Sequence, residues 1–241
     1  DLHLSLRRQR QMCIRDSFWL GSIFSTGATQ LYFVGMGWLV FKLTGSALYL
    51  GLLGVAMAVP TILATLAGGL VADHGNRGRI LLITSILAGL ALGILTILDL
   101  GDWVTVWQVL LLAALLGLIS GFDLPARVSF FPALIEPNQM MSAVALNSIL
   151  WQGTRMVLPA IGGVLIALAD TWIIFALCTV GFAVMAKILL SLQTPDAFPK
   201  HSDHNRGLTA AWRFILQEKL FAVLIAMTWI SMFFGTAYVQ I

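Results

Sequence analysis

Seven long apolar stretches dominate the sequence and restrict the folds open to it. They cover residues 18–41, 47–72, 80–98, 103–122, 141–168, 171–192 and 220–241. A membrane-spanning helix needs roughly 20 mostly apolar residues. Only 10% of the chain is charged, whereas soluble domains carry about a quarter charged residues. Since one soluble core cannot enclose so much apolar surface, the sequence predicts an all-α membrane protein.

The order of these stretches predicts the domain organisation. Residues 18–192 hold six of them and are expected to form an N-terminal six-helix transmembrane bundle. Residues 193–219 are polar and form a predicted cytoplasmic linker, in which Leu208–Lys219 has the apolar spacing of a helix lying on the membrane surface. Residues 220–241 are interpreted as a truncated seventh transmembrane helix. This layout is typical of membrane proteins built from two six-helix halves.

The first 17 residues allow two interpretations. Met12–Ser17 resembles a translated sequencing-adaptor remnant, which would make residues 1–17 a non-native tail. The alternative is a short, basic, amphipathic tail that belongs to the protein. The first predicted span therefore begins at Phe18.

Basic residues predict the orientation in the membrane. With the N-terminus in the cytoplasm, eleven Lys and Arg side chains fall on the inner side and only Lys42 on the outer side. Leaving out the tail still gives seven against one, so the positive-inside rule places the N-terminus in the cytoplasm. The net charge of +3 therefore indicates the lipid bilayer as a partner, and no nucleic acid.

A charged turn between the second and third stretches is the strongest local pattern. It places a carboxylate at a helix end, followed by two guanidinium groups; the residues are Gly69, Asp73, Arg77 and Arg79. Gly75 and Gly78 are expected to supply positive φ in this turn. On physical grounds the turn is either a specific charged contact or an ordinary basic loop that anchors the topology.

This turn resembles motif A of the major facilitator superfamily, Gly-x-x-x-Asp-(Arg/Lys)-x-Gly-(Arg/Lys)-(Arg/Lys). Gly69, Asp73 and Arg77 match, and Arg79 supplies the second charge one position late. His74, Asn76 and Gly78 depart from the pattern. The resemblance implies a conformational latch that favours the outward-facing state.

Four further stretches, 43–47, 58–60, 123–127 and 131–134, resemble the transmembrane secretion effector branch, which includes enterobactin exporters. Asp123, Pro125 and Arg127 belong to one of them and are expected in a cytoplasmic turn after the fourth helix. The resemblance runs from Phe18 to the end of the chain. It implies a multi-pass protein of the bacterial inner (plasma) membrane.

Arg155 lies near the middle of the fifth stretch, where an arginine costs about 2.5–3.5 kcal/mol on insertion scales. At four-residue spacing, Asn147 and Trp151 share its helix face, and Gln152 flanks it. We therefore expect a substrate cavity at this face. The alternative is a structural Arg155 that is paired inside the bundle.

The resemblance adds two expectations around this cavity. Pro159, Gly162 and Gly163 resemble the end of the exporter motif C and would form a hinge in the fifth helix. Cavity walls would come from the first, fourth and fifth helices, which makes Gln30 a cavity residue. Gln30 belongs to a polar stripe on the first helix, and such a stripe can instead bond to its own backbone.

The leading functional hypothesis is a secondary active exporter of amphipathic small molecules or siderophores, exchanged for protons by alternating access. No Asp or Glu lies inside any complete predicted span. The carboxylate that couples export to protons is therefore Asp73, Asp123 or a residue of a second half. An uncoupled or substrate-specific permease of the same fold is the alternative.

Other functional classes lack their sequence signals. The chain has no GxSxG or HExxH motif and no paired aspartates, and its four histidines lie outside the apolar stretches, so an enzyme is not predicted. No Cys/His cluster indicates a metal site, and no cofactor motif occurs. A filter loop and an ATP-binding Gly-Lys-Ser/Thr loop are also absent from the sequence.

Overall fold

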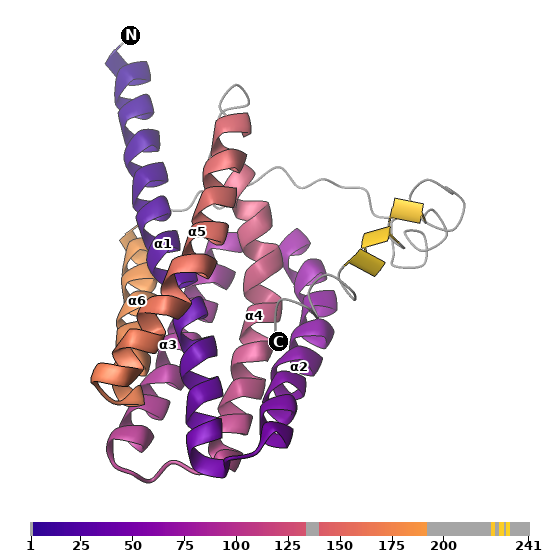
Figure 1. Ribbon diagram of the computed structural model, residues 1–241. Helices are drawn as coiled ribbons and strands as arrows, with labels where there is room; N and C mark the ends of the chain where they lie inside the picture. Colours follow the sequence, from indigo (N-terminus) through magenta and orange to yellow (C-terminus); the bar gives the residue numbers. More distant parts are fainter. Residues whose placement is uncertain (1, 134–139, 192–222, 225–226, 229, 232–241) are drawn as a thin grey trace. The chain divides into compact units, whose positions relative to one another are not determined.

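The computed structural model describes residues 2–133, 140–191, 223–224, 227–228 and 230–231. Six helices make up almost all of the first two ranges (Figure 1); they are α1 (Leu2–Thr44), α2 (Ala47–His74), α3 (Arg77–Leu100), α4 (Val106–Ala133), α5 (Met140–Leu168) and α6 (Thr171–Ser191). The chain divides into two units, Asp1–Phe198 and Pro199–Ile241, and α1–α6 belong to the first. The predicted all-α fold class is confirmed.

Five of these helices, α2 to α6, are long and apolar enough to cross a membrane. Many of their large apolar side chains are exposed; Leu111, Met156 and Leu168 are 71, 82 and 82% exposed. Apolar surface on this scale requires lipid as the solvent, so the protein is a multi-pass membrane protein. Helix α1 does not reach the same hydropathy, because polar side chains such as Thr29 and Gln30 interrupt its apolar run. Its crossing stays a prediction.

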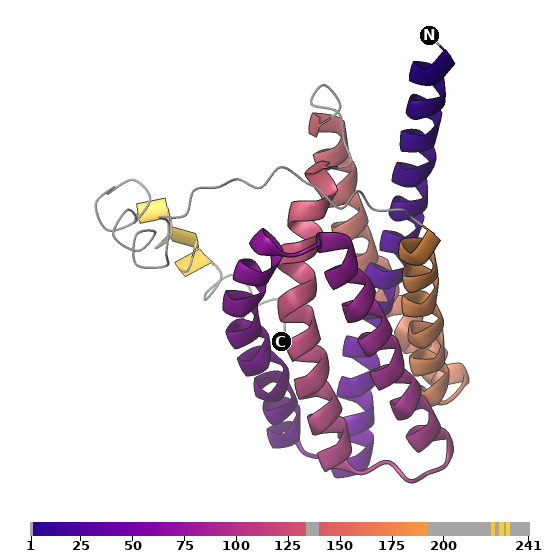
Figure 2. The same cartoon turned by 180° about the vertical axis from the view of Figure 1, so that it is seen from behind.

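The helices of the first unit lie side by side with their long axes roughly aligned (Figures 1 and 2). Helix α1 packs against α5 and α6, α2 packs against α4, and α3 packs against both α4 and α6. Their shared core contains fully buried side chains such as Tyr32, Leu92, Leu116 and Phe175. Helix α1 begins at Leu2, so the tail, whose origin stays an interpretation, continues this helix.

Small residues let α2 and α4 approach closely. A Cβ atom added at Gly121 would lie 2.7 Å from the Thr61 backbone oxygen, and one added at Gly68 would lie 2.6 Å from the Gly121 oxygen. The Thr61 hydroxyl also donates a hydrogen bond of 2.9 Å to the Gly117 oxygen. We call this contact, made by Gly68, Gly117 and Gly121, the glycine seam.

The turn between α2 and α3 is built differently from our expectation. Neither Gly75 nor Gly78 has a positive φ: Gly75 has φ −94°, and Gly78 lies inside α3. Gly75 is required for space instead, because a Cβ there would lie 2.7 Å from the Val71 oxygen. The Asn76 side chain accepts a hydrogen bond from the Arg79 backbone N–H and so caps α3.

Helix α4 also corrects a predicted boundary. The cytoplasmic turn that we expected at Asp123, Pro125 and Arg127 does not exist, because α4 continues to Ala133. Ala126 and Phe130, four residues apart, are 0 and 1% exposed and anchor this part of the helix in a second core cluster. Their burial stabilises this part of α4, and the charged neighbours Asp123 and Arg127 form an ion pair.

The predicted surface helix Leu208–Lys219 lies outside the described residues, as does most of the predicted seventh span. Six residues of that span are described and are helical, with the Thr228 hydroxyl donating to the Leu224 oxygen. Both elements stay predictions.

Candidate functional site

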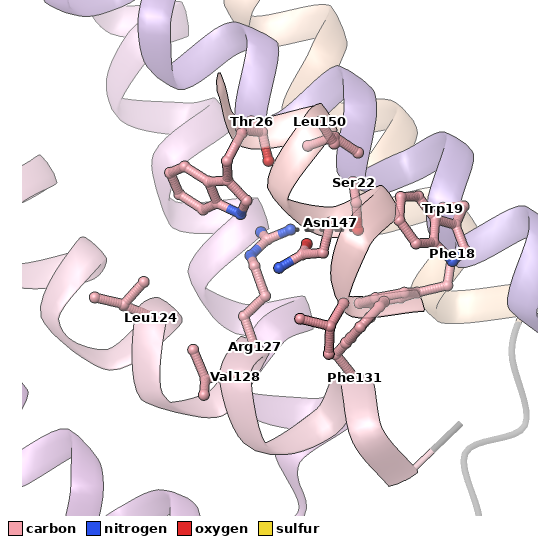
Figure 3. Close-up of a pocket in the computed structure, with 12 residues that line it drawn as sticks. Phe18, Trp19, Ser22, Thr26, Leu124, Arg127, Val128, Phe131, Asn147 and Leu150 are labelled. Atoms are coloured by element: carbon pink, nitrogen blue, oxygen red, sulfur yellow. Dashed lines mark hydrogen bonds between the residues drawn. The ribbon is translucent and has the colours of Figure 1, made fainter. Parts of the chain in front are cut away.

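A pocket of about 380 Å³ lies between α1, α4 and α5, and each helix contributes four lining residues. Figure 3 shows their side chains converging on this space. Most of the lining is apolar, and its aromatic members are Phe18, Trp19, Phe131 and Trp151. The polar members are Ser22, Thr26, Arg127 and Asn147. Apolar walls with a few polar groups are typical of small-molecule sites.

Aromatic contacts close the pocket between α1 and α4. The Trp19 and Phe131 rings meet edge to face, with centroids 5.5 Å apart. The Phe18 ring lies 5.1 Å from the ring of Phe130, which is buried in the second core cluster. These contacts fix one end of the pocket wall in place.

The charged group of the pocket is an ion pair within α4. Arg127 Nε lies 3.0 Å from Asp123 Oδ2, and Nη2 lies 3.4 Å from Asp123 Oδ1. The two residues are four positions apart and therefore share a helix face. Their side chains are only 11 and 23% exposed, so the pair is largely buried. Asp123 is not a lining residue, whereas Arg127 is.

Neighbouring helices hold both partners of this pair. The Thr84 hydroxyl on α3 donates to Asp123 Oδ1 at 3.0 Å. On the other side, Arg127 Nη1 donates to Ser25 Oγ at 3.2 Å and to Ser22 Oγ at 3.5 Å, both on α1. Three helices therefore meet at one polar cluster, which we call the Asp123–Arg127 cluster. Its members satisfy each other, as buried charges require.

The position of Asp123 corrects a second expectation. The fourth predicted span, residues 103–122, contains no carboxylate, but Asp123 lies within Val106–Phe131, the part of α4 that is long and apolar enough to cross a membrane. Its charge is accommodated there by Arg127 and Thr84. The sequence contains a signal for this ion pair. Asp123 and Arg127 are four residues apart and therefore share a helix face, and the buried residues around them also have helical spacing.

The predicted cavity residues separate into two groups. Asn147 and Trp151 line the pocket, and Figure 3 shows Asn147 and Arg127 pointing toward one another from α5 and α4. Arg155 and Gln152 are exposed, and Gln30 is half-buried; none of them lines this pocket.

Arg155 follows Trp151 by four residues on α5. Its guanidinium group forms no hydrogen bond or ion pair within the described part of the chain. The alternative that Arg155 is paired inside this bundle therefore receives no support from these residues. Its proposed contact with substrate is untested by the structure.

The motif A residues lie at the junction of α2 and α3. Gly69 is in α2 and Asp73 is in its last turn, but the Asp73 side chain lies outside the described set. Arg77, at the start of α3, donates from Nη1 to the Ser129 oxygen of α4 at 3.0 Å. The backbone of Arg79 is held by the α3 cap. This junction is therefore fastened to α4, while its role as a latch stays a prediction.

The predicted hinge residues lie in an unbroken helix. Pro159 is inside α5, which runs from Met140 to Leu168. Gly162 is buried against α1, where an added Cβ would lie 3.3 Å from a Leu31 methyl carbon. At Gly163, no atom of the described part of the chain lies within 4 Å of an added Cβ. Gly162 thus has a packing role, and the hinge stays a prediction.

Several pocket residues were not found by sequence reasoning. Phe18 and Trp19 lie at the start of the first predicted span and Phe131 lies near the end of α4, where aromatic residues usually anchor membrane helices at the interface. Arg127 was identified as a charged residue of the motif, but in a turn. No pattern in one sequence shows that these residues meet, because the contacts join positions about 110 residues apart.

At the opposite end of the bundle, polar groups join α1, α3 and α6. Lys42 Nζ lies 3.3 Å from Asp170 Oδ1, with both side chains more than half exposed. The Thr171 hydroxyl donates to Asp99 Oδ2. This outer cluster ties the helix ends together far from the pocket. Among the described residues, no group of His, Cys, Asp or Glu could hold a metal ion.

Comparison with known proteins places the chain. The sequence model of the transmembrane secretion effector family matches residues 9–239. A staphyloferrin A transporter of Staphylococcus aureus is 29% identical over 60% of this chain and 38% of its own length. An enterobactin exporter of Citrobacter koseri is 26% identical over 74% of this chain and 40% of its own length. A multidrug efflux pump of Mycolicibacterium fortuitum is 31% identical over 56% of this chain and 34% of its own length.

The chain spans about two fifths of the length of these curated relatives. The family match covers almost the whole chain, and the relatives are transporters and exporters. The predicted resemblance is therefore confirmed: the chain belongs to the transmembrane secretion effector family of the major facilitator superfamily.

Proposed function

We propose that the protein containing this chain is a secondary active transporter that exports amphipathic small molecules or siderophores. The observation that carries the proposal is the pocket between α1, α4 and α5, with its aromatic walls and four polar side chains. Its volume of about 380 Å³ is within the range of small-molecule sites. The relatives include exporters of siderophores and drugs, which supports this class of cargo.

The position of the pocket is compatible with export. With the N-terminus in the cytoplasm, the pocket lies in the inner part of the bundle, because Phe18 near the start of the first predicted span and Phe131 near the end of α4 both line it. A cargo molecule would therefore load from the cytoplasm or the inner leaflet. Rocking of the two halves about this site would then release it outside.

Asp123 is our candidate for the carboxylate that couples export to protons. It lies in the part of α4 that is long and apolar enough to cross a membrane, and it contacts Arg127, a lining residue of the pocket. We place the protein in the bacterial inner membrane, where a proton gradient is available. The uncoupled permease of the same fold stays the alternative.

Efflux measurements with the full-length protein test this proposal. Cells loaded with uncharged, anionic and cationic amphipathic dyes should extrude at least one dye only when the protein is present. Val144→Trp, which fills the pocket, should abolish this efflux. Ile149→Trp is the matched control, because Ile149 is on α5 but outside the pocket and 67% exposed. Equal loss in both variants would remove the pocket from the mechanism.

A protonophore separates the two coupling hypotheses. Export against a concentration gradient should stop when the proton gradient collapses, provided that ATP is kept constant. Continued flux only down the dye gradient would identify the uncoupled permease, and continued uphill export with ATP would identify a pump.

A further inference from the structure

We infer that the pocket selects uncharged amphipathic molecules, and that Asp123 sets this selectivity by neutralising Arg127. This inference rests on the proposed function and names the charge class of the cargo.

The charged groups at the pocket wall are a guanidinium and a carboxylate. Arg127 is the charged member of the lining described above, and the other polar members are neutral hydroxyl and amide groups. Asp123 lies directly behind it at 3.0 Å. One positive and one negative group therefore contribute no net charge to the pocket.

Placing the charge of a ligand in this pocket is energetically costly. An anionic ligand would have to displace Asp123 from the guanidinium or share it with a second anion, at a site where the Arg127 side chain is only 11% exposed. A cationic ligand would meet Arg127 itself. Both arrangements leave a buried charge without adequate compensation, which is costly in a medium of low dielectric constant.

An uncharged ligand can form favourable contacts with the same pocket wall. The Arg127 guanidinium donates two hydrogen bonds to Asp123 and one each to Ser22 and Ser25, so few N–H groups remain. Asn147 adds an amide that faces Arg127 (Figure 3). A ligand with an aromatic or aliphatic body and one or two carbonyl or hydroxyl groups matches this surface.

Two matched fluorescent probes test the inference. N-phenyl-1-naphthylamine is uncharged, and 8-anilino-1-naphthalenesulfonate has the same rings with an added sulfonate. Binding to the full-length protein in lipid nanodiscs is followed by energy transfer from tryptophan, because Trp19 and Trp151 line the pocket. The Val144→Trp variant, with its signal calibrated for the added tryptophan, gives the background from lipid. Wild-type protein should bind the uncharged probe at least about tenfold more tightly.

Asp123→Asn should weaken or abolish this preference. The variant leaves Arg127 without its carboxylate, so the affinity for the sulfonate probe should rise about tenfold or more. The double variant Asp123→Asn, Arg127→Gln removes both charges and should restore a preference for the uncharged probe. If Asp123→Asn does not insert, Arg127→Gln gives the opposite test, because the lone Asp123 should weaken sulfonate binding further.

The outcomes separate the inference from the proposed function. A wild-type preference for the sulfonate probe, or an unchanged probe ratio in Asp123→Asn, would overturn the charge selectivity while leaving the pocket intact. If Val144→Trp binds both probes as well as the wild type does, the pocket is not the binding site. That result would overturn the proposed function as well.

Discussion

Gly121→Ala tests whether the glycine seam holds α2 and α4 together. An added methyl group would lie 2.7 Å from the Thr61 oxygen and 2.5 Å from the Ala64 Cβ. Carbon atoms prefer separations of about 3.5–4.0 Å, so the two helices must move apart by roughly 1 Å or more at this contact. Overpacking of this kind costs about 1–3 kcal/mol.

Gly163→Ala provides the matched control. Gly163 is also inside one of the long apolar helices, but no atom of the described residues lies within 4 Å of the added Cβ. Both substitutions gain the same helix propensity, about 1 kcal/mol, so this gain cancels when the two variants are compared. The difference in stability between them should therefore equal the packing cost of about 1–3 kcal/mol.

The measurement is the temperature at which half of the full-length protein in detergent loses its monodisperse peak in size-exclusion chromatography. Gly121→Ala should melt roughly 3–10 °C below Gly163→Ala. A double variant with Gly117→Ala should lose less than the sum of the single losses, because one separation of the helices relieves both contacts. Equal melting temperatures for Gly121→Ala and Gly163→Ala would show that α2 and α4 are not in close contact.

Three further predictions concern topology, the α5 cation and the outer cluster. Reporter fusions at residues 99–102 should be active outside the cytoplasm and fusions at 193–207 inside it; the reverse pattern would overturn the orientation. Arg155→Ala should abolish efflux without preventing insertion, whereas wild-type efflux would make Arg155 part of the scaffold. Lys42→Ala should lower stability by at most about 0.5 kcal/mol, since its ion pair with Asp170 is exposed, and the difference should vanish in high salt; a loss that persists there would contradict this assignment.

Much of the fold could be predicted from hydropathy. Helices α2, α3, α5 and α6 begin and end within a few residues of the apolar stretches, except where α3 starts earlier at Arg77. The end of α4 was missed because two charges were interpreted as a solvent-exposed turn. Charges end a transmembrane segment only when nothing neutralises them, and here Asp123 and Arg127 neutralise each other.

The candidate site was less accessible to sequence reasoning. Helical spacing correctly indicated that Asn147 and Trp151 share a face, and both line the pocket. The same spacing also included Arg155, which lies beyond this pocket. Spacing on one helix identifies a face, but the limits of a pocket depend on the opposing helices. The apolar lining residues, such as Phe18, carry no chemical signal of their own.

The unequal attachment of the pocket walls has a mechanical consequence. The backbones of α2 and α4 are in close contact along the glycine seam, so the two helices are expected to move together as one rigid unit. Helix α5 has only three buried residues within the described structure, Ala143, Leu150 and Gly162. Changes in pocket width during a transport cycle should therefore arise from displacement of α5, with α4 as the stationary wall.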